Sequence, residues 1–232
     1  FARSTHSNPF AYFRDETDIL EFVECFIDNT TGDKEHSNDP FWEKAERLLY
    51  VALIGYLVVH CPEEDRSFSG LVTLLSLAKA KESDEDYMSP LDLLFERVRT
   101  GKKYVNSGEE PSPYDYEGKT AYGGQSSRWR YVEIGKPVKI DDDFSLLHYK
   151  MFKDAAGKTL KSILISCNTR LEPVAIPQVR EVLSRDEMEL DCMGDEGRKI
   201  AVFAIMSDTR KTYSFLLAIM MWQTMNLLCD KA

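Results

Sequence analysis

The feature that most constrains the fold is a repeat of apolar residues with the period of an α-helix. Near the start of the chain the repeat consists of Ile19, Leu20, Phe22, Val23, Phe26 and Ile27. This spacing puts the six side chains on one helix face, and we expect a helix from about Asp15 to Asn29. Acidic residues at its N-terminus lie where the helix dipole favours negative charge.

Two dipeptides, Asp39-Pro40 and Ser89-Pro90, predict further helix starts. In each, a capping side chain precedes a proline whose missing N–H has no helical partner to lose. The helix that starts at Asp39-Pro40 is apolar nearly all round beyond Ile54 and should end before Pro62. We therefore expect it at the centre of the core. A helix between the two is marked by Leu71, Leu74, Leu75 and Ala78. The helix that starts at Ser89 should run through Val98.

Residues 101–142 differ from the rest because they lose helical periodicity and are rich in Gly, Pro and Tyr. Two short β-like runs, Arg128–Ile134 and Val138–Ile140, flank Gly135-Lys136-Pro137 and are candidates to pair as a small hairpin. Structureless loops of this length are uncommon inside compact domains. We therefore interpret residues 101–142 as an insertion with some order of its own.

The stretch Gly157-Lys158-Thr159 resembles the end of a nucleotide phosphate loop, G-x-x-x-x-G-K-[ST]. The first glycine of that motif would fall at position 152, which is Phe152. The apolar pattern also continues through the stretch, so we predict one helix, capped by Asp143, from Phe144 to about Asn168. Within it Gly157 would cost about 1 kcal/mol relative to alanine, and Lys158 would have no free N–H groups beside it. No nucleotide site is expected here.

The C-terminal part changes class. A short helix, Gln178–Leu183, is followed by the apolar run Lys199–Met206, which has the length of a strand buried on both faces. A long apolar helix, Tyr213–Cys229, comes next, and Asp208 is the expected cap. Strand, turn and helix in this order are typical of α/β proteins. The expected fold class is thus mainly α, a helical bundle with a small irregular or β-hairpin insertion and a C-terminal strand–helix piece of an α/β domain.

Composition narrows the function classes. The net charge of −10 disfavours a protein that coats nucleic acid with its whole surface but permits a local basic patch. No C-x-x-C or H-x-x-x-H spacing occurs, so no metal site is expected. We expect free thiols in a reducing compartment, buried at Cys25, Cys167 and Cys229. The remaining cysteines and the histidines are Cys61, Cys192, His6, His36, His60 and His148.

No apolar run reaches the roughly 18 residues of a membrane span, and no signal peptide opens the sequence. Because the chain begins at Phe1 and stops just after a strong apolar helix, we expect it to be a piece of a larger protein.

Several segments together resemble one family, the type IV secretion coupling proteins (TraG/TraD-like conjugation ATPases), in the form carried by mobile elements of Gram-positive bacteria. The segments are SNPFAYF (Ser7–Phe13), DPFWEKAERLLYVALIGYL (Asp39–Leu57), the acidic stretch followed by MSPLDLLFE (Glu82–Glu96), YKMFKDAAGKTLKSILISC (Tyr149–Cys167) and Arg198–Ala232. Residues 101–142 are longer than the family pattern suggests.

The resemblance implies a membrane-anchored hexameric ATPase whose RecA-like motor is interrupted by a cytoplasmic all-α domain. The implied division is residues 1–14 as a linker from the motor, 15–185 as the all-α domain and 186–232 as the returning strand and helix. The phosphate loop and the Asp-Glu strand of the motor would lie outside this chain. No catalytic, cofactor-binding or metal-binding residue is therefore assigned, and ATP and Mg²⁺ belong to the parent protein.

Two functions stay open. The resemblance implies a docking domain that brings relaxase–DNA complexes, or another relaxosome protein, to the secretion channel. The alternative is a structural spacer on the motor without a partner surface of its own. A free-standing enzyme has little support, because the acidic runs are typical of solvated faces and no Ser or Cys has an evident His partner.

One candidate partner surface is the lysine stripe, which we define as Lys150, Lys153, Lys158 and Lys161. On a continuous helix these side chains span an arc of about 140°. The stripe is either a solvated face or a docking strip for phosphate or for an acidic protein face. In the second case Arg128, Trp129 and Arg130 would extend it.

Overall fold

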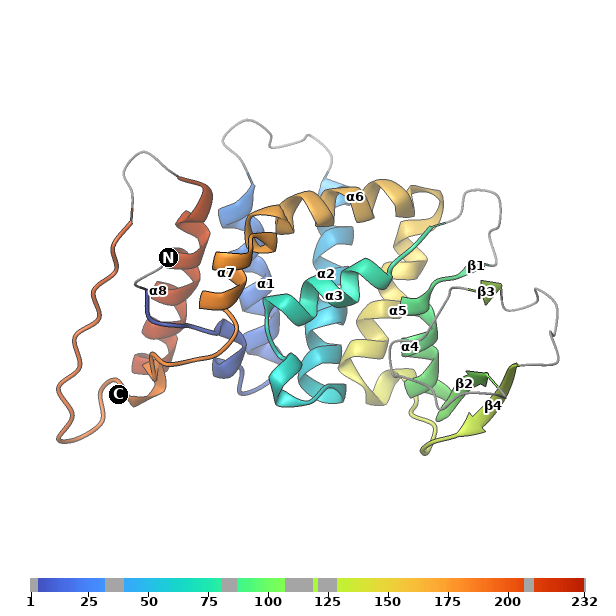
Figure 1. Ribbon diagram of the computed structural model, residues 1–232, viewed down its shortest axis with the longest axis horizontal. Coiled ribbons are helices and arrows are strands. Elements are labelled where there is room, and N and C mark those ends of the chain that lie inside the picture. Colours follow the sequence, from blue (N-terminus) through green and yellow to red (C-terminus); the bar gives the residue numbers. More distant parts are fainter. Residues whose placement is uncertain are drawn as a thin grey trace.

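The computed structural model describes residues 4–31, 40–80, 87–106, 119–120, 129–206 and 211–231, and this part of the chain is mainly helical. Helices surround α2, which lies in the middle of the molecule (Figure 1). The α-helices are α1 Glu16–Thr30, α2 Pro40–His60, α3 Phe68–Leu77, α4 Pro90–Thr100, α5 Phe144–Ala156, α6 Leu160–Leu171, α7 Pro177–Val182 and α8 Ser214–Cys229. The predicted helices before residue 101, and those near residues 178 and 213, are confirmed to within a few residues.

Local capping explains where several helices begin. The Asp15 carboxylate accepts hydrogen bonds from the N–H groups of Thr17 and Asp18, at 2.8 and 3.1 Å. At α4, Ser89 and Asp92 form a reciprocal capping box. Each such cap stabilises its helix by about 1 kcal/mol. The predicted cap of α2, Asp39, lies outside the described residues.

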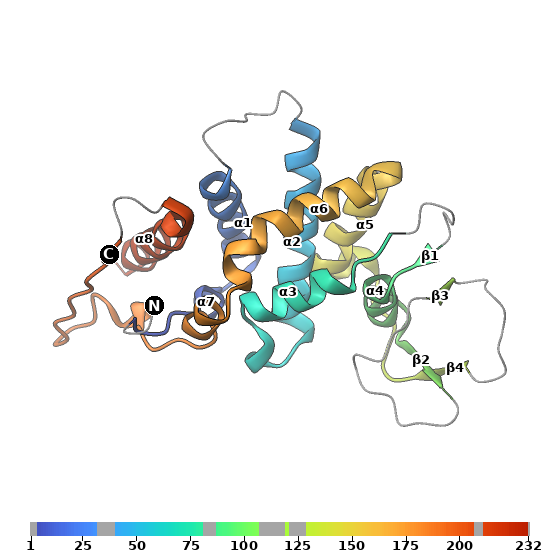
Figure 2. The ribbon, with the colours of Figure 1, turned by 45° about the horizontal axis from the view of Figure 1, so that its top comes forward.

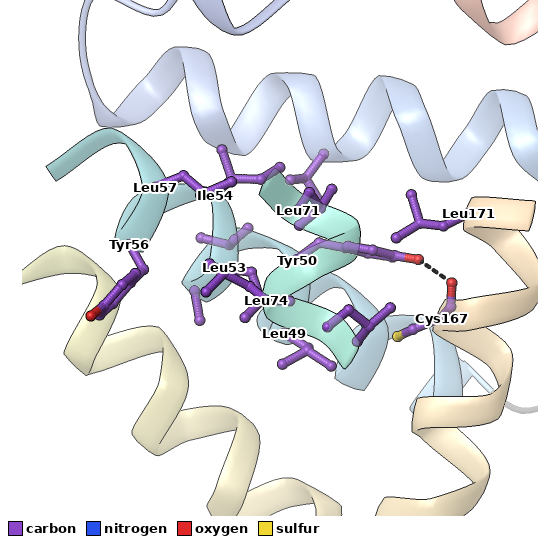
Figure 3. Packing of buried hydrophobic residues seen from close by; sticks show 14 of the residues in the cluster. Leu49, Tyr50, Leu53, Ile54, Tyr56, Leu57, Leu71, Leu74, Cys167 and Leu171 are labelled. Atoms are coloured by element: carbon purple, nitrogen blue, oxygen red, sulfur yellow. Dashed lines mark hydrogen bonds between the residues drawn. The ribbon is translucent and has the colours of Figure 1, made fainter. Parts of the chain in front are cut away.

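The core is built around α2, as its apolar sequence predicts. Leu49, Tyr50, Leu53 and Ile54 are fully buried. The Tyr50 hydroxyl, which burial would leave unsatisfied, donates a hydrogen bond of 2.8 Å to the carbonyl oxygen of Cys167 (Figure 3). This bond attaches α6 to the central helix.

Helix α5 packs tightly along α2 in the opposite direction. His60, the last residue of α2, lies beside Asp143, the N-cap of α5, with Nε2 and Oδ2 2.7 Å apart. A Cβ atom added at Gly55 would come within 3.0 Å of the Phe144 ring. Glycine at position 55 therefore permits the close approach of the first turn of α5 to α2.

The strands lie beside α4 and differ from the predicted hairpin. Strand β2 (Lys102–Asn106) pairs antiparallel with β4 (Trp129–Glu133), and a short β1 (Tyr87–Met88) pairs with β3 (Lys119–Thr120). The predicted pairing with Val138–Ile140 is wrong. The Val138 N–H donates to the Val98 carbonyl of α4, and Ile140 begins a 3₁₀ turn. Gly101, in a left-handed conformation, ends α4 and leads directly into β2, which pairs with β4.

The predicted strand Lys199–Met206 is not formed. These residues have no regular secondary structure, and the side chains of Phe203 and Ile205 are 87% and 96% exposed. A strand apolar on both faces needs neighbouring strands, and the described part of the chain places none beside it. The prediction of a buried strand at these residues is therefore wrong for the described chain.

Helix α8 packs against α1 and belongs to the same core. Its Phe215 ring lies 5.7 Å from the Phe26 ring, measured between centroids. Phe10, from the segment expected to be a linker, is also buried there. The N-cap position of α8 is Tyr213, and the predicted cap Asp208 lies outside the described residues. None of the described helices combines the length and apolar character that crossing a membrane requires.

All five cysteines are free, as expected. Cys167 is buried and Cys25 is partly buried, whereas Cys229 is exposed, so the expectation of burial is wrong for Cys229. Burial raises the pKa of the Cys167 thiol well above its ordinary value.

Candidate functional site

The lysine stripe is interrupted by a break in the backbone. Helix α5 ends at Ala156, Gly157–Thr159 form a 3₁₀ turn, and α6 begins at Leu160 in a different direction (Figures 1 and 2). Gly157 has φ 44° and ψ −130°, a conformation that residues with a side chain rarely adopt. The predicted continuous helix from Phe144 to Asn168 is therefore wrong. Gly157 is the residue that lets the chain turn.

The break changes the position of Lys158 but does not create a phosphate loop. Lys158 lies in the turn before α6, not in the middle of a helix. A phosphate loop follows a strand, whereas this turn follows α5. The position of the missing first glycine, Phe152, is a fully buried core residue. This turn therefore lacks both the preceding strand and the first glycine of a phosphate loop.

The stripe residues are divided between two helices. Lys150 and Lys153 lie on α5, and Lys161 lies on α6. Lys150 and Lys161 are exposed, and the side chain of Lys158 lies outside the described part. The arc of about 140° assumed one straight helix, so these lysines do not form one strip along a single face.

Lys153 has a structural partner. Its Nζ lies 2.9 Å from Asp92 Oδ1, and the Tyr149 hydroxyl donates to the same oxygen at 2.8 Å. The other Asp92 oxygen accepts hydrogen bonds from the N–H and hydroxyl of Ser89. Asp92 therefore ties α5 to the N-terminus of α4, and Lys153 balances its charge.

The expected extension of the stripe lies elsewhere. Trp129 and Arg130 belong to β4, opposite Asn106 and Val105 of β2, and their side chains, like all of Arg128, lie outside the described part. Strand β4 leads into the N-terminal end of α5, while α6 follows its C-terminal end (Figure 1). The 13 residues of α5 separate these ends by about 20 Å.

The described residues hold no group of three or more His, Cys, Asp or Glu side chains arranged to bind a metal. One buried carboxylate, that of Asp143, is paired with a histidine, His60. Burial by itself raises the pKa of the Asp143 carboxyl, but hydrogen bonds from Ser145 and the Leu146 N–H, together with His60, outweigh it. The net pKa lies below the ordinary value, as for a carboxylate that caps a helix.

Sequence reasoning missed one polar cluster, formed by Asn8, Tyr12 and Asp186. Asn8 and Asp186 lie 178 positions apart in the sequence, so local patterns do not connect them. One local signal was present, because Asn8 followed by Pro9 is a helix-start pattern. Asn8 indeed caps the short 3₁₀ helix η1 (Pro9–Tyr12).

Comparisons with known proteins identify the family. Neither the curated proteins nor the solved structures contain a match to this chain. One family model does match, described as type IV secretory system conjugative DNA transfer, and it covers residues 1–232. Because the match spans the whole sequence, the chain belongs to the type IV secretory system conjugative DNA transfer family, the family of TraG/TraD-like coupling proteins.

Proposed function

We propose that this chain is a substrate-docking domain of a conjugative coupling protein, which brings relaxase–DNA complexes to the secretion channel. The observation that carries the proposal is the family match over residues 1–232 on a chain whose described part is a helical bundle. A bundle without a phosphate loop suits binding better than phosphoryl transfer. We therefore assign no catalysis to this chain, and ATP and Mg²⁺ to the motor of the parent protein.

The proposed setting follows from the resemblance of the sequence segments. The bundle would face the cytoplasm on a membrane-anchored, hexameric motor of a Gram-positive mobile element. Its partners would be a relaxase or another relaxosome protein, single-stranded DNA, and the remainder of the motor. Residues 186–232 would return to the RecA-like domain, whose sheet would supply the neighbours that Lys199–Met206 lacks.

Within this proposal, Lys150 and Lys161 are the docking candidates of the lysine stripe. Both are exposed, so a partner reaches them without unfolding the bundle. Lys153 is a weaker candidate because it is only partly exposed and its ion pair with Asp92 supports the fold. That pairing is the observation that favours the alternative function, a structural spacer in which the lysines only support the fold.

The test is the double charge reversal Lys150→Glu with Lys161→Glu. We expect weaker capture of the cognate relaxase and a lower conjugation frequency. If phosphate is contacted, the salt dependence of DNA binding should also fall by about one unit of slope per lost lysine. The matched control is Lys44→Glu with Lys199→Glu, because both side chains are exposed and lie outside α5, α6 and residues 101–142.

Thermal unfolding of both double variants establishes that the fold is retained. If the Lys150/Lys161 variant folds and binds and transfers like the control, these lysines are not a docking surface. The spacer function would then be favoured, and the search for a partner surface would move to residues 101–142.

A further inference from the structure

Two segments that are far apart in the sequence lie side by side next to α7. The Ser7 N–H donates to the Val182 carbonyl at 2.8 Å, and the Glu187 N–H donates to the His6 carbonyl at 3.0 Å. The first segment, residues 4–14, precedes α1, and the second, residues 183–192, follows α7. Figures 1 and 2 both show the first segment passing beside α7.

Tyr12 and Asp186 join these segments through their side chains. The Tyr12 hydroxyl donates to Asp186 Oδ2 at 2.6 Å and accepts a hydrogen bond from the Leu190 N–H at 3.2 Å. The Tyr12 ring packs with Leu190 and with Leu227 of α8. Burial and the Asp186 carboxylate raise the pKa of Tyr12, so its hydroxyl remains a donor at neutral pH.

Asn8 attaches the same junction to the bundle. Its N–H donates to Asp186 Oδ1 at 3.3 Å, and its Oδ1 accepts from the Phe10 N–H at 3.1 Å. Its side-chain amide donates to the Arg66 carbonyl at 2.7 Å, just before α3. With 7% of its surface exposed, Asn8 has all its polar groups engaged.

We propose that Asn8, Tyr12 and Asp186 form a latch that holds the two chain connections of the bundle together. With the latch closed, the segment before α1 and the segment after α7 form one joint. This joint opens only when the hydrogen bonds of Tyr12 and Asn8 break. The latch rests on the proposed division between the bundle and the motor, but not on the docking role of the lysines.

The test is Tyr12→Phe in the full 232-residue chain, which removes the hydroxyl and keeps the ring. Amide hydrogen exchange is followed residue by residue. We expect the amides of Ser7, Glu187 and Leu190 to exchange about tenfold faster, because the joint opens more often. The amides of α2 and α5 should keep their wild-type rates.

The matched control is Tyr50→Phe, which removes a hydroxyl inside the bundle. It should speed exchange in α2 and α6 and leave the amides of Ser7 and Glu187 unchanged. A second latch variant, Asn8→Asp, keeps the acceptor for Phe10 but loses the donor to Arg66 and adds charge beside Asp186. It should reproduce the Tyr12→Phe pattern, and it provides the test if Tyr12→Phe fails to fold.

Two results would overturn the latch. In the first, Leu190 alone exchanges faster, so that the hydroxyl serves only its nearest amide. In the second, exchange rises equally throughout the chain, so that Tyr12 and Asn8 belong to the global unfolding unit and not to a local joint.

Discussion

Arg170 of α6 and Glu46 of α2 form a buried ion pair, with 2.9 Å between Nη2 and Oε2 and side chains only 12% and 3% exposed. The second Arg170 nitrogen, Nη1, donates to the Ile27 carbonyl and to the Thr30 hydroxyl at the end of α1. One guanidinium therefore connects three helices, and it adds a charged donor to the Ile27 carbonyl near the C-terminus of α1.

Removing this guanidinium should be strongly destabilising. We expect Arg170→Met to lower the free energy of unfolding by about 3–5 kcal/mol, because it leaves the Glu46 carboxylate buried without its partner. Arg170→Lys keeps the charge but not the planar fork and should fall between Met and wild type. Denaturant unfolding measures both.

The control for Arg170 is Arg185→Met. Arg185 pairs with Glu181 and Glu187 on the surface, where such pairs typically contribute less than about 1 kcal/mol. Equal losses for Arg170→Met and Arg185→Met would contradict the special role of the buried pair.

Gly157→Ala tests the break between α5 and α6. In a continuous helix this change would stabilise the protein by about 1 kcal/mol. At φ 44° and ψ −130° it should instead destabilise by about 1–3 kcal/mol. A Cβ atom at position 157 meets nothing within 4 Å, so only backbone strain decides the sign. Thermal unfolding distinguishes the two outcomes.

Gly135→Ala is the matched control, because its added Cβ also meets nothing within 4 Å and its φ is not positive. It should be neutral or slightly stabilising. A gain of stability in Gly157→Ala would instead support the single continuous helix predicted from the sequence.

The Asp143 carboxylate should make stability depend on pH in the acid range. Because its pKa in the folded protein lies below the ordinary 3.8, its contribution is present above that pH and is lost as pH falls through the folded pKa. Asp143→Asn retains a helix cap but no charge. The difference in unfolding free energy between wild type and this variant should be constant near neutrality and shrink below about pH 4. A difference that grows on acidification would show the opposite sign of shift.

We expect no binding of Mg-ATP by this chain. The Gly157-Lys158-Thr159 turn follows a helix, and the first glycine of the phosphate-loop motif is replaced by Phe152. Calorimetry should detect no saturable heat, and Lys158→Ala should behave like wild type. A micromolar dissociation constant that disappears in Lys158→Ala would refute this assignment.

Local sequence patterns predicted most of the helices well, for physical reasons that act over a few residues. The start of α1 at Asp15 and that of α4 at Ser89 follow from side chains that cap the next turn. The apolar face of α1, and the apolar residues on all sides of α2, predicted which side chains are buried. These features depend on the i to i+4 neighbours, which the sequence specifies directly.

The candidate site was less predictable because its geometry depends on one backbone conformation. The lysine stripe follows from spacing only if the helix continues through Gly157. Glycine is tolerated within helices and also allows turns, so the residue type alone does not distinguish the two cases. The packing of α6 across α2, through Tyr50 and Arg170, favours the turn.

Long-range pairing was decided only by the tertiary structure. The sequence by itself determined that Trp129–Glu133 is a strand and that Lys199–Met206 is apolar, but not what either would meet. Strand β4 pairs with β2, which begins directly after α4 ends at Gly101. No strand of the described chain pairs with Lys199–Met206. Asn8 and Tyr12 likewise form hydrogen bonds with Asp186, although they precede it by 178 and 174 positions in the sequence. These bonds form only when the folded bundle brings the two segments together. Helical periodicity depends on residues that are close in sequence. The long-range contacts require the chain to close a loop that spans most of the protein, and no local sequence pattern predicts which residues then meet.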